Sequence, residues 1–161
     1  MGLTAVLGLC LLGCLALHPC LHGAQANKCR RGWLELRGHC YGYVRQELSW
    51  RKAEGWCQAA GGGCHLASLH SPEEHRALAA FVAQRRREEE EEEEEGVWIG
   101  LYHRRPSWRW ADGSELRYSA WEGDDGPKGR RCAALEDSAG FLLWEEDSCG
   151  ERKPFLCKHP A

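Results

Sequence analysis

The chain has 161 residues, with 21 basic and 24 acidic side chains and a formal net charge of −3. It contains no nucleic-acid-binding motif and no strongly basic segment, so we expect no nucleic-acid partner. It also lacks the G-x-S-x-G, H-E-x-x-H and glycine-rich phosphate motifs of common enzymes, so we expect a protein without catalytic residues.

The first residues are typical of a secretory signal peptide. Residues 3–17 are apolar and uncharged, and this run is shorter than the roughly 20 residues that a membrane-spanning helix needs. Ala24 and Ala26 flank Gln25 in the small-x-small pattern of a cleavage site, although no basic residue precedes the apolar run. We predict a signal peptide over 1–26 and one soluble, secreted domain over 27–161, with a membrane anchor as the alternative.

Cleavage after Ala26 leaves seven cysteines in an oxidising compartment, where disulfides are the default state. Because seven is odd, at least one thiol stays unpaired or bonds to another chain, and spacing alone leaves 105 arrangements open. A zinc site is the rival interpretation, but the mature chain has no C-x-x-C or H-x-x-x-H pair. The seven residues are Cys29, Cys40, Cys57, Cys64, Cys132, Cys149 and Cys157.

Local patterns predict the elements of the N-terminal half. Residues 32–44 alternate around Leu34 and Leu36 and turn at Arg37-Gly38, as a β-hairpin does. A helix follows, ended by three glycines, and His65–Leu69 is a short strand. The apolar face of that helix comprises Trp50, Ala53, Cys57 and Ala60.

The start of a second helix carries clear capping signals. Ser71 suits the N-cap, Pro72 suits the first helical position, and Glu74 completes a capping box. The buried stripe of this helix is predicted to be His75, Leu78, Ala79 and Val82.

Three arginines and eight glutamates, Glu88–Glu95, come next. Without these glutamates the formal charge would change from −3 to +5, so a mildly basic body carries one concentrated acidic segment. Like charges at helical spacing cost about 0.2–0.5 kcal/mol each, so we expect the run to be an acidic loop over 88–95 without helical structure. A solvated linker is the alternative to a functional role.

Short strands are predicted for the rest of the chain. Residues 97–102 are almost wholly apolar and should form a central strand, and residues 107–111 alternate before a turn at Asp112-Gly113. Residues 121–131 are polar and glycine-rich, which indicates a long surface loop. The segments 132–136, 141–146 and 155–158 are the final strands. The whole pattern is an α+β fold with two helices, short antiparallel sheets and a disulfide-stapled core.

Several segments together resemble the C-type lectin-like domain over the whole mature length. They are "CRRGWLELRGHCYGY", "SWRKAEGWC", "HLASLHSPEEH", "VWIGL", "CAAL", "LLWEEDSC" and "FLCK". The resemblance implies three disulfides, Cys29–Cys40, Cys57–Cys157 and Cys132–Cys149. It leaves Cys64 as the free thiol. A buried, inert thiol is the first interpretation, since unpaired cysteine packs like a small hydrophobe, and an intermolecular bridge or a reactive site is the alternative.

The family's calcium-dependent lectins hold Ca²⁺ and sugar with an E-P-N or Q-P-D loop motif and a W-N-D strand motif. Here Gly126–Lys128 and Trp144–Glu146 stand at those positions, and the one asparagine, Asn27, lies far away in the sequence. Glutamate offers no amide donor to a sugar hydroxyl, and Lys128 places a positive charge near the metal. We therefore expect neither sugar binding of this kind nor a high-affinity metal site.

Within that family, four features are more specific: "GHCYGYVRQELSWRKAEGWC", "SPEEHRALAAFVAQ", "DDGPKGRRCAALEDSAGFLLWEEDSCGER" and the acidic stretch just before "VWIGL". In these the chain resembles the avian eggshell matrix proteins of the ansocalcin, struthiocalcin and ovocleidin group. The resemblance implies a secreted extracellular-matrix protein of the eggshell that contacts calcium carbonate and modulates crystal nucleation or growth. The alternative is an antimicrobial module that binds bacterial surface polymers. The second interpretation predicts binding to bacterial walls that survives deletion of Glu88–Glu95.

Calcium takes six to eight oxygen ligands, often carboxylates, so we expect many individually weak contacts acting together. No cofactor is required. The candidate mineral-interacting residues are Glu88, Glu89, Glu90, Glu91, Glu92, Glu93, Glu94, Glu95, Asp124, Asp125, Glu145, Glu146 and Asp147. Basic residues are candidates for contact with acidic matrix polymers, and a bipolar molecule invites self-association. Ser71 matches the S-x-E pattern of secretory phosphorylation, although its capping role explains the same residue.

Overall fold

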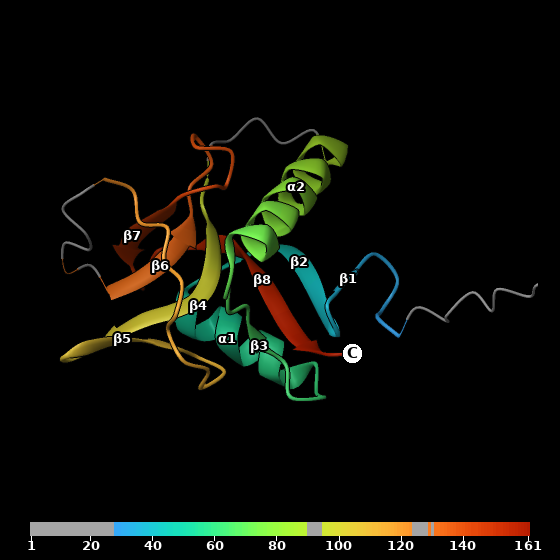
Figure 1. Cartoon of the computed structure of the whole chain (residues 1–161), viewed down its shortest axis with the longest axis horizontal. Coiled ribbons are helices and arrows are strands. Elements are labelled where there is room, and N and C mark those ends of the chain that lie inside the picture. The colour runs from blue at the N-terminus through green and yellow to red at the C-terminus, as the bar shows by residue number, and fades with distance from the viewer. Residues whose placement is uncertain (1–27, 90–94, 124–128, 130) are drawn as a thin grey trace, which may run out of the picture.

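The computed structural model describes residues 28–89, 95–123, 129 and 131–161, so the predicted signal peptide lies outside the described residues. Two helices pack against a twisted sheet, and a smaller part of that sheet extends away as a hairpin (Figure 1). The elements are β1 (Leu34–Leu36), β2 (His39–Leu48), α1 (Trp50–Ala59), β3 (His65–Leu66), α2 (Pro72–Glu88), β4 (Val97–Arg104), β5 (Ser107–Trp110), β6 (Arg131–Leu135), β7 (Trp144–Ser148) and β8 (Lys153–Pro160).

The sheet order is β1-β2-β8-β4-β6-β7, with β3 paired to β8 and β5 paired to β4. The C-terminal strand β8 therefore lies beside the N-terminal strand β2, with His39 opposite Pro160. The β1–β2 turn has positive φ at both Arg37 and Gly38, the backbone that a two-residue hairpin needs. The α+β prediction and the predicted hairpin are both confirmed.

Strand β4 is central, as its apolar sequence predicts. Trp98, Ile99 and Leu101 are wholly buried, because β8 and β6 flank the strand and side chains cover both faces. A Cβ atom on Gly100 would lie 2.4 Å from the carbonyl oxygen of Leu66. Glycine at this position therefore allows β3 to approach the central strand closely.

The three disulfides implied by the family resemblance are present: Cys29–Cys40, Cys57–Cys157 and Cys132–Cys149. Cys64 is unpaired and buried. The Cys57–Cys157 bridge ties α1 to β8 across a sequence separation of 100 residues. Bridges that close such long loops restrict the unfolded chain most strongly.

Several predicted boundaries were wrong. The strand expected at His65–Leu69 is confined to β3. The strand expected over 141–146 begins only at Trp144, because Phe141 has a left-handed φ of 63° and turns into the core. The second helix continues through the three arginines to Glu88, so the first glutamate of the run is helical and not part of a loop.

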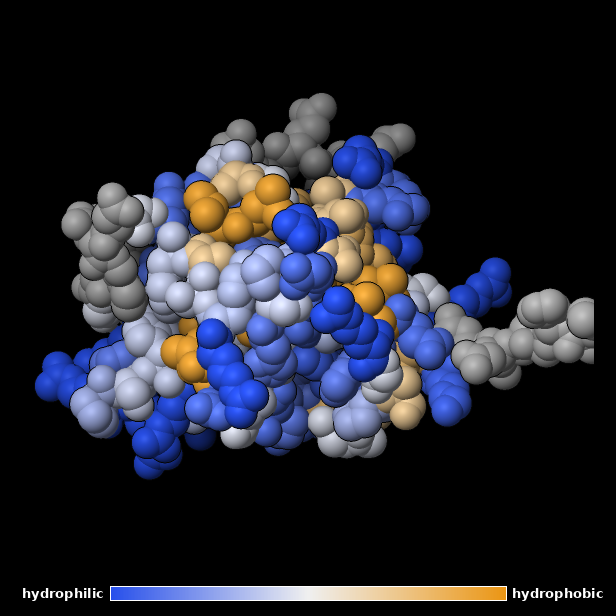
Figure 2. Space-filling view, viewed as in Figure 1, coloured by the Kyte–Doolittle hydropathy of each residue, from blue (hydrophilic) through white to orange (hydrophobic). Residues whose placement is uncertain are grey.

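The surface is uneven in polarity. On the face shown in Figure 2, apolar residues gather in the upper part and hydrophilic residues cover most of the lower part. Among the described residues, Leu142 is 49% exposed, more than any other large apolar side chain. No helix in the described part of the chain combines the length and apolar character needed to cross a bilayer.

Candidate functional site

The first two glutamates of the acidic run make hydrogen bonds and an ion pair at the C-terminal end of α2. Gln84 donates to the Glu88 carboxylate at 3.1 Å, and Arg85 Nη1 lies 3.2 Å from Glu88 Oε2. Glu89 is the C-cap residue and donates its amide to the Arg86 carbonyl. These i,i+3 and i,i+4 pairs offset the repulsion that would otherwise unwind this turn.

Arg86 connects the two ends of the run. Its buried guanidinium donates to the carbonyl of Glu95, lies 3.6 Å from the Asp137 carboxylate, and covers the Phe141 ring at 5.5 Å. The sequence interpretation treated the three arginines alike. The helical stripe that includes Val82 reaches Arg86 one turn later, so extending the periodicity would have singled this residue out.

The residue just past the far end of the run, Gly96, lies against Glu145 of β7. A Cβ atom on Gly96 would stand 2.1 Å from Glu145 Oε1 and 3.1 Å from the Leu135 carbonyl oxygen. Only glycine therefore fits here without displacing Glu145. Residues 90–94 of the run lie outside the described residues. Gly96, the residue that follows the run, thus packs against an acidic side chain from a distant part of the sequence.

Glu145 and Asp147 of β7 surround a lysine that sequence reasoning missed. Lys153 Nζ lies 3.0 Å from Asp147, 3.6 Å from Glu151 and 3.8 Å from Glu145. Its ammonium also lies 5.5 Å from the Trp98 ring centre. Burial and the neighbouring Asp147 charge raise the pKa of Glu145 to about 7, although Lys153 opposes the shift. Burial alone would lower the pKa of Lys153, but the hydrogen bond and charge of Asp147 outweigh it and raise that pKa.

Glu146 has a different role on the same strand. Its two carboxylate oxygens accept the backbone amides of Gly129 at 3.0 Å and Arg131 at 2.9 Å. This carboxylate therefore fastens the end of the long loop to β7. Asp124, Asp125 and the 126–128 segment lie outside the described residues. Strand β7 lies where related lectins hold calcium with their W-N-D motif. Its described carboxylates, Glu145, Glu146 and Asp147, all contact other groups of this protein.

The raised pKa of Glu145 predicts a stability effect with a definite sign. A folded-state pKa above the unfolded value means that stability is greatest below the unfolded pKa, near 4.5, and is lost as the pH rises towards 7. Glu145→Gln imitates the protonated acid and keeps a donor for Asp147. We expect it to raise the free energy of unfolding by about 2 kcal/mol at pH 8, after allowing for partial solvent screening, and to change it little at pH 4.

Urea unfolding at both pH values measures this difference. Glu146→Gln is the matched control on the next residue, because it weakens two backbone hydrogen bonds and should destabilise the protein at pH 8. Equal effects of the two substitutions at pH 8 would contradict a pKa of Glu145 that is raised to about 7.

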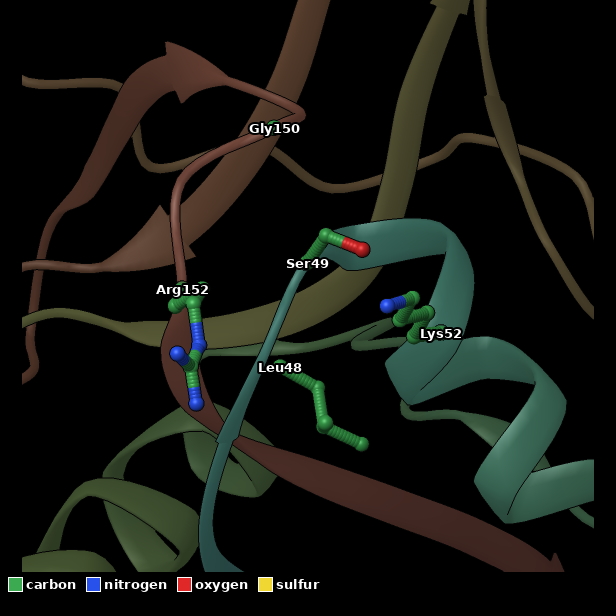
Figure 3. A pocket seen from close by; sticks show the side chains of 5 residues that line it. All are labelled: Leu48, Ser49, Lys52, Gly150 and Arg152. Atoms are coloured by element: carbon green, nitrogen blue, oxygen red, sulfur yellow. The ribbon is translucent and has the colours of Figure 1, made fainter.

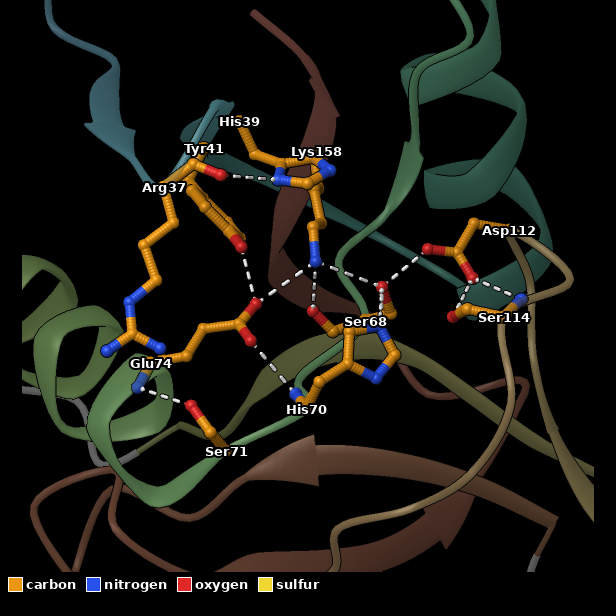
Figure 4. Close-up of polar contacts among 10 residues, drawn as sticks. All are labelled: Arg37, His39, Tyr41, Ser68, His70, Ser71, Glu74, Asp112, Ser114 and Lys158. Carbon is orange, nitrogen blue, oxygen red and sulfur yellow. Dashed lines mark hydrogen bonds and ion pairs between the residues drawn. The ribbon is translucent and has the colours of Figure 1, made fainter.

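A second polar cluster is buried between α2, β2 and β8 (Figure 4). Lys158 Nζ donates to Glu74 Oε1 at 3.0 Å and to the Ser68 carbonyl and hydroxyl at 3.0 and 3.2 Å. Tyr41 also donates to Glu74, and Ser68 donates to Asp112. Burial would raise the pKa of Glu74, but the Tyr41 hydrogen bond and the Lys158 charge outweigh it and lower that pKa. Burial and the same carboxylate raise the pKa of Tyr41.

This cluster modifies the predicted capping box. Ser71 accepts the Glu74 amide at 3.1 Å, as predicted. The Glu74 side chain, however, accepts the His70 amide at 3.0 Å and the Tyr41 and Lys158 donors. The buried stripe of α2 is confirmed, and its His75 ring bonds to Tyr118 and to the Phe141 carbonyl.

Described residues line two hollows that are open at the surface. One, of about 480 Å³, is lined by Leu48, Ser49, Lys52, Gly150 and Arg152 (Figure 3). The other, of about 520 Å³, includes His39, His65, His70 and His159 in its lining. Neither is lined by the described ends of the acidic run. Lys52 and Arg152 make the first hollow basic, while the Arg152 guanidinium also donates to the Glu47 carbonyl at 3.3 Å.

The chain is similar in sequence to a known domain family and to several of its members. The family model described as the lectin C-type domain matches residues 46–159. Dromaiocalcin-1 of Dromaius novaehollandiae is 60% identical over 145 residues, which cover 90% of this chain and 100% of that one. Rheacalcin-1 of Rhea americana is 62% identical over 137 residues, which cover 85% and 99%.

A solved structure is similar in fold as well as in sequence. Ovocleidin-17, described as a major protein of the Gallus gallus eggshell calcified layer, superposes with a TM-score of 0.73 at 40% identity. The match covers 83% of this chain and 99% of ovocleidin-17.

Proposed function

This chain belongs to the C-type lectin domain family, and on that basis we propose that it is a secreted eggshell-matrix protein that binds calcium carbonate and modulates crystal nucleation and growth. The proposal follows from its likeness to ovocleidin-17 of the eggshell calcified layer and to the calcin relatives. It does not include the calcium-dependent sugar binding of other family members, since glutamates replace the amide-bearing strand motif.

The observation that carries this proposal is the anchoring of the glutamate run. Arg86 fixes the Glu95 end to the helix that bears Glu88 and Glu89. The two described ends of the run therefore lie close together, on a body whose formal charge without the run would be +5. Many weak oxygen ligands acting on one crystal surface then produce multivalent binding.

The β7 carboxylates contribute less in this proposal. Lys153 already neutralises part of the charge of Glu145 and Asp147, and Glu146 accepts two backbone amides. They support the run by adding negative potential beside Gly96 rather than by chelating calcium. Contacts of Asp124 and Asp125 with mineral stay a prediction, as do weak multivalent Ca²⁺ binding without a required cofactor and self-association.

Two further parts of the proposal concern partners and modification. The basic hollow containing Lys52 and Arg152 is the described surface that suits an acidic matrix polymer. Phosphorylation of Ser71 would add charge at the N-terminus of α2, where the helix dipole favours an anion. It would act on a hydroxyl that already accepts the Glu74 amide.

The test neutralises the centre of the run without shortening it. Changing residues 90–94 from Glu to Gln keeps the described anchor residues Glu88, Glu89 and Glu95 and alters the formal charge from −3 to +2. We expect the variant to lose most of the effect of the protein on calcium carbonate nucleation time and crystal habit, because five of the eight clustered carboxylates are lost.

A charge-matched control separates clustering from net charge. The same five Glu→Gln changes made at exposed sites scattered over the body should leave the effect on carbonate intact. Those sites are Glu35, Glu47, Glu73, Glu115 and Glu122. Equal activity of the run variant and the unmodified protein would exclude the run as the mineral-binding element. Equal loss in both variants would show that net charge alone matters.

A further inference from the structure

Three cysteine sulfurs meet in the core beneath α1. Cys57 of α1 and Cys157 of β8 form a disulfide, and the unpaired Cys64 lies just before β3. The three Sγ atoms all lie within 4.8 Å of one another. Each residue is at most 1% exposed. A thiol therefore adjoins a disulfide in a place that dissolved thiols and other protein chains do not reach.

The pairing of β3 with β8 explains this arrangement. Leu66 of β3 lies opposite Cys157 of β8, and His65 lies opposite Lys158. Residues two apart on an extended chain point to the same face, so Cys64 projects to the side that Leu66 and Cys157 share. The separation of the three sulfur atoms agrees with this placement. Cys64 is thus a diagonal cross-strand neighbour of Cys157.

We propose that Cys64 is an internal exchange partner of this disulfide, so that the protein interconverts between a Cys57–Cys157 form and a Cys64–Cys157 form. Cys64 first gives up its thiol proton. Its thiolate then attacks Cys157 Sγ and forms a new S–S bond, while the old S–S bond breaks and Cys57 leaves as a thiolate that takes up a proton. One S–S bond forms and one breaks, so no oxidant or reductant is consumed.

Loop length favours attack on Cys157 over attack on Cys57. The present bridge spans 100 residues, and the Cys64–Cys157 bridge would span 93 (157 minus 64), so the two restrict the unfolded chain almost equally. Attack on Cys57 would instead close a loop of seven residues and release β8. The exchange proposed here keeps β8 cross-linked and transfers the other end of the bridge from α1 to the segment before β3.

Local geometry makes the exchanged form the minor one. Diagonal neighbours have Cα atoms about 7–8 Å apart, whereas a disulfide needs roughly 5.5–6 Å, so the segment around Cys64 must move by about 1–2 Å. This segment can yield, because β3 has two residues and the preceding Gly61–Gly63 all have positive φ. Burial raises the pKa of Cys64 to about 11, so exchange is slow at neutral pH and accelerates as the pH rises.

The direct test removes the leaving cysteine. The secreted Cys57→Ser variant should form the Cys64–Cys157 bridge, so that no free thiol is titrated in denaturant and non-reducing peptide mapping finds that pair. Cys40→Ser is the matched control, because its partner Cys29 belongs to a different pair; this variant should titrate two free thiols, those of Cys29 and Cys64. A folded Cys57→Ser protein with two free thiols would overturn the proposal.

A second measurement uses the unmodified chain and does not depend on the folding of a variant. The protein is held at pH 7 or pH 9.5, quenched in acid, labelled on its single thiol in denaturant and mapped. We expect the label on Cys64 to be joined by a fraction on Cys57 that appears about tenfold faster for each pH unit, in step with the thiolate population. Cys64→Ser should carry no label. Label confined to Cys64 at both pH values after long incubation would overturn the proposal.

Discussion

Replacing Lys158 with methionine is expected to lower the free energy of unfolding by about 3 kcal/mol, because it leaves the Glu74 carboxylate charged and buried without a cation. The Glu74 side chain is only 10% exposed and the Lys158 side chain 7%, and their charged atoms lie 3.0 Å apart. Tyr41 and the His70 amide would still donate to Glu74, but neither carries a compensating charge. Urea unfolding at pH 7 measures the loss.

The pH dependence of this loss has a defined direction. The pKa of Glu74 is lowered in the folded protein, so its contribution is present above the ordinary carboxyl pKa of 4.5 and is lost as the pH falls below it. Without Lys158 the lowering weakens, so the variant should lose less stability than the unmodified protein between pH 5 and pH 3. A double variant, Glu74→Gln with Lys158→Met, should recover part of the loss at pH 7, since it buries no charge. A double variant as unstable as the sum of the two single variants would contradict a coupled pair.

Replacing Lys153 with methionine is expected to produce the second large effect, a loss of about 2 kcal/mol at pH 8 and much less at pH 4. Methionine fills a similar volume against Trp98 but leaves Glu145, Asp147 and Glu151 without their shared cation. Lys153 at present opposes the raised pKa of Glu145, so its removal raises that pKa further. A raised pKa of Glu145 in the folded protein means that ionising this group at higher pH costs stability. The loss caused by Lys153→Met therefore grows from acid to alkaline pH.

The same substitution tests whether the β7 carboxylates can accept calcium at all. Without the lysine, millimolar Ca²⁺ at pH 8 should raise the melting temperature of Lys153→Met by several degrees and that of the unmodified protein by less, because a bound cation would replace the missing ammonium. Mg²⁺ at the same ionic strength is the control, since it keeps its hydration shell and demands stricter geometry. Identical shifts in both proteins would show that these carboxylates do not form a cation site.

Local sequence patterns predicted most of the elements because each depends on neighbouring residues. The Arg37-Gly38 turn, the Ser71 cap and the apolar β4 strand were all identified from short-range signals. Errors arose where a tertiary contact overrode the pattern. Phe141 looks like a strand residue but serves as a core contact, and Arg86 looks like one of three solvated arginines but is buried beside Asp137. The capping-box interpretation accounted for the amide of Glu74 but not for the partners of its carboxylate.

The sequence by itself determined the segment order, the α+β class, the position of the glutamate run between α2 and β4, and, through its family resemblance, the disulfide pairs. These follow from periodicity, capping and motif spacing, which are written in adjacent residues. Only the tertiary structure decided which charges meet. Lys158 contacts Glu74, which is 84 positions away in the sequence, and Lys153 contacts the carboxylates of β7. Arg86 of α2 bonds to the far end of the glutamate run. The tertiary structure also places Cys64 beside the disulfide between α1 and β8. Strand register and helix docking set these contacts, and neither is encoded in local spacing.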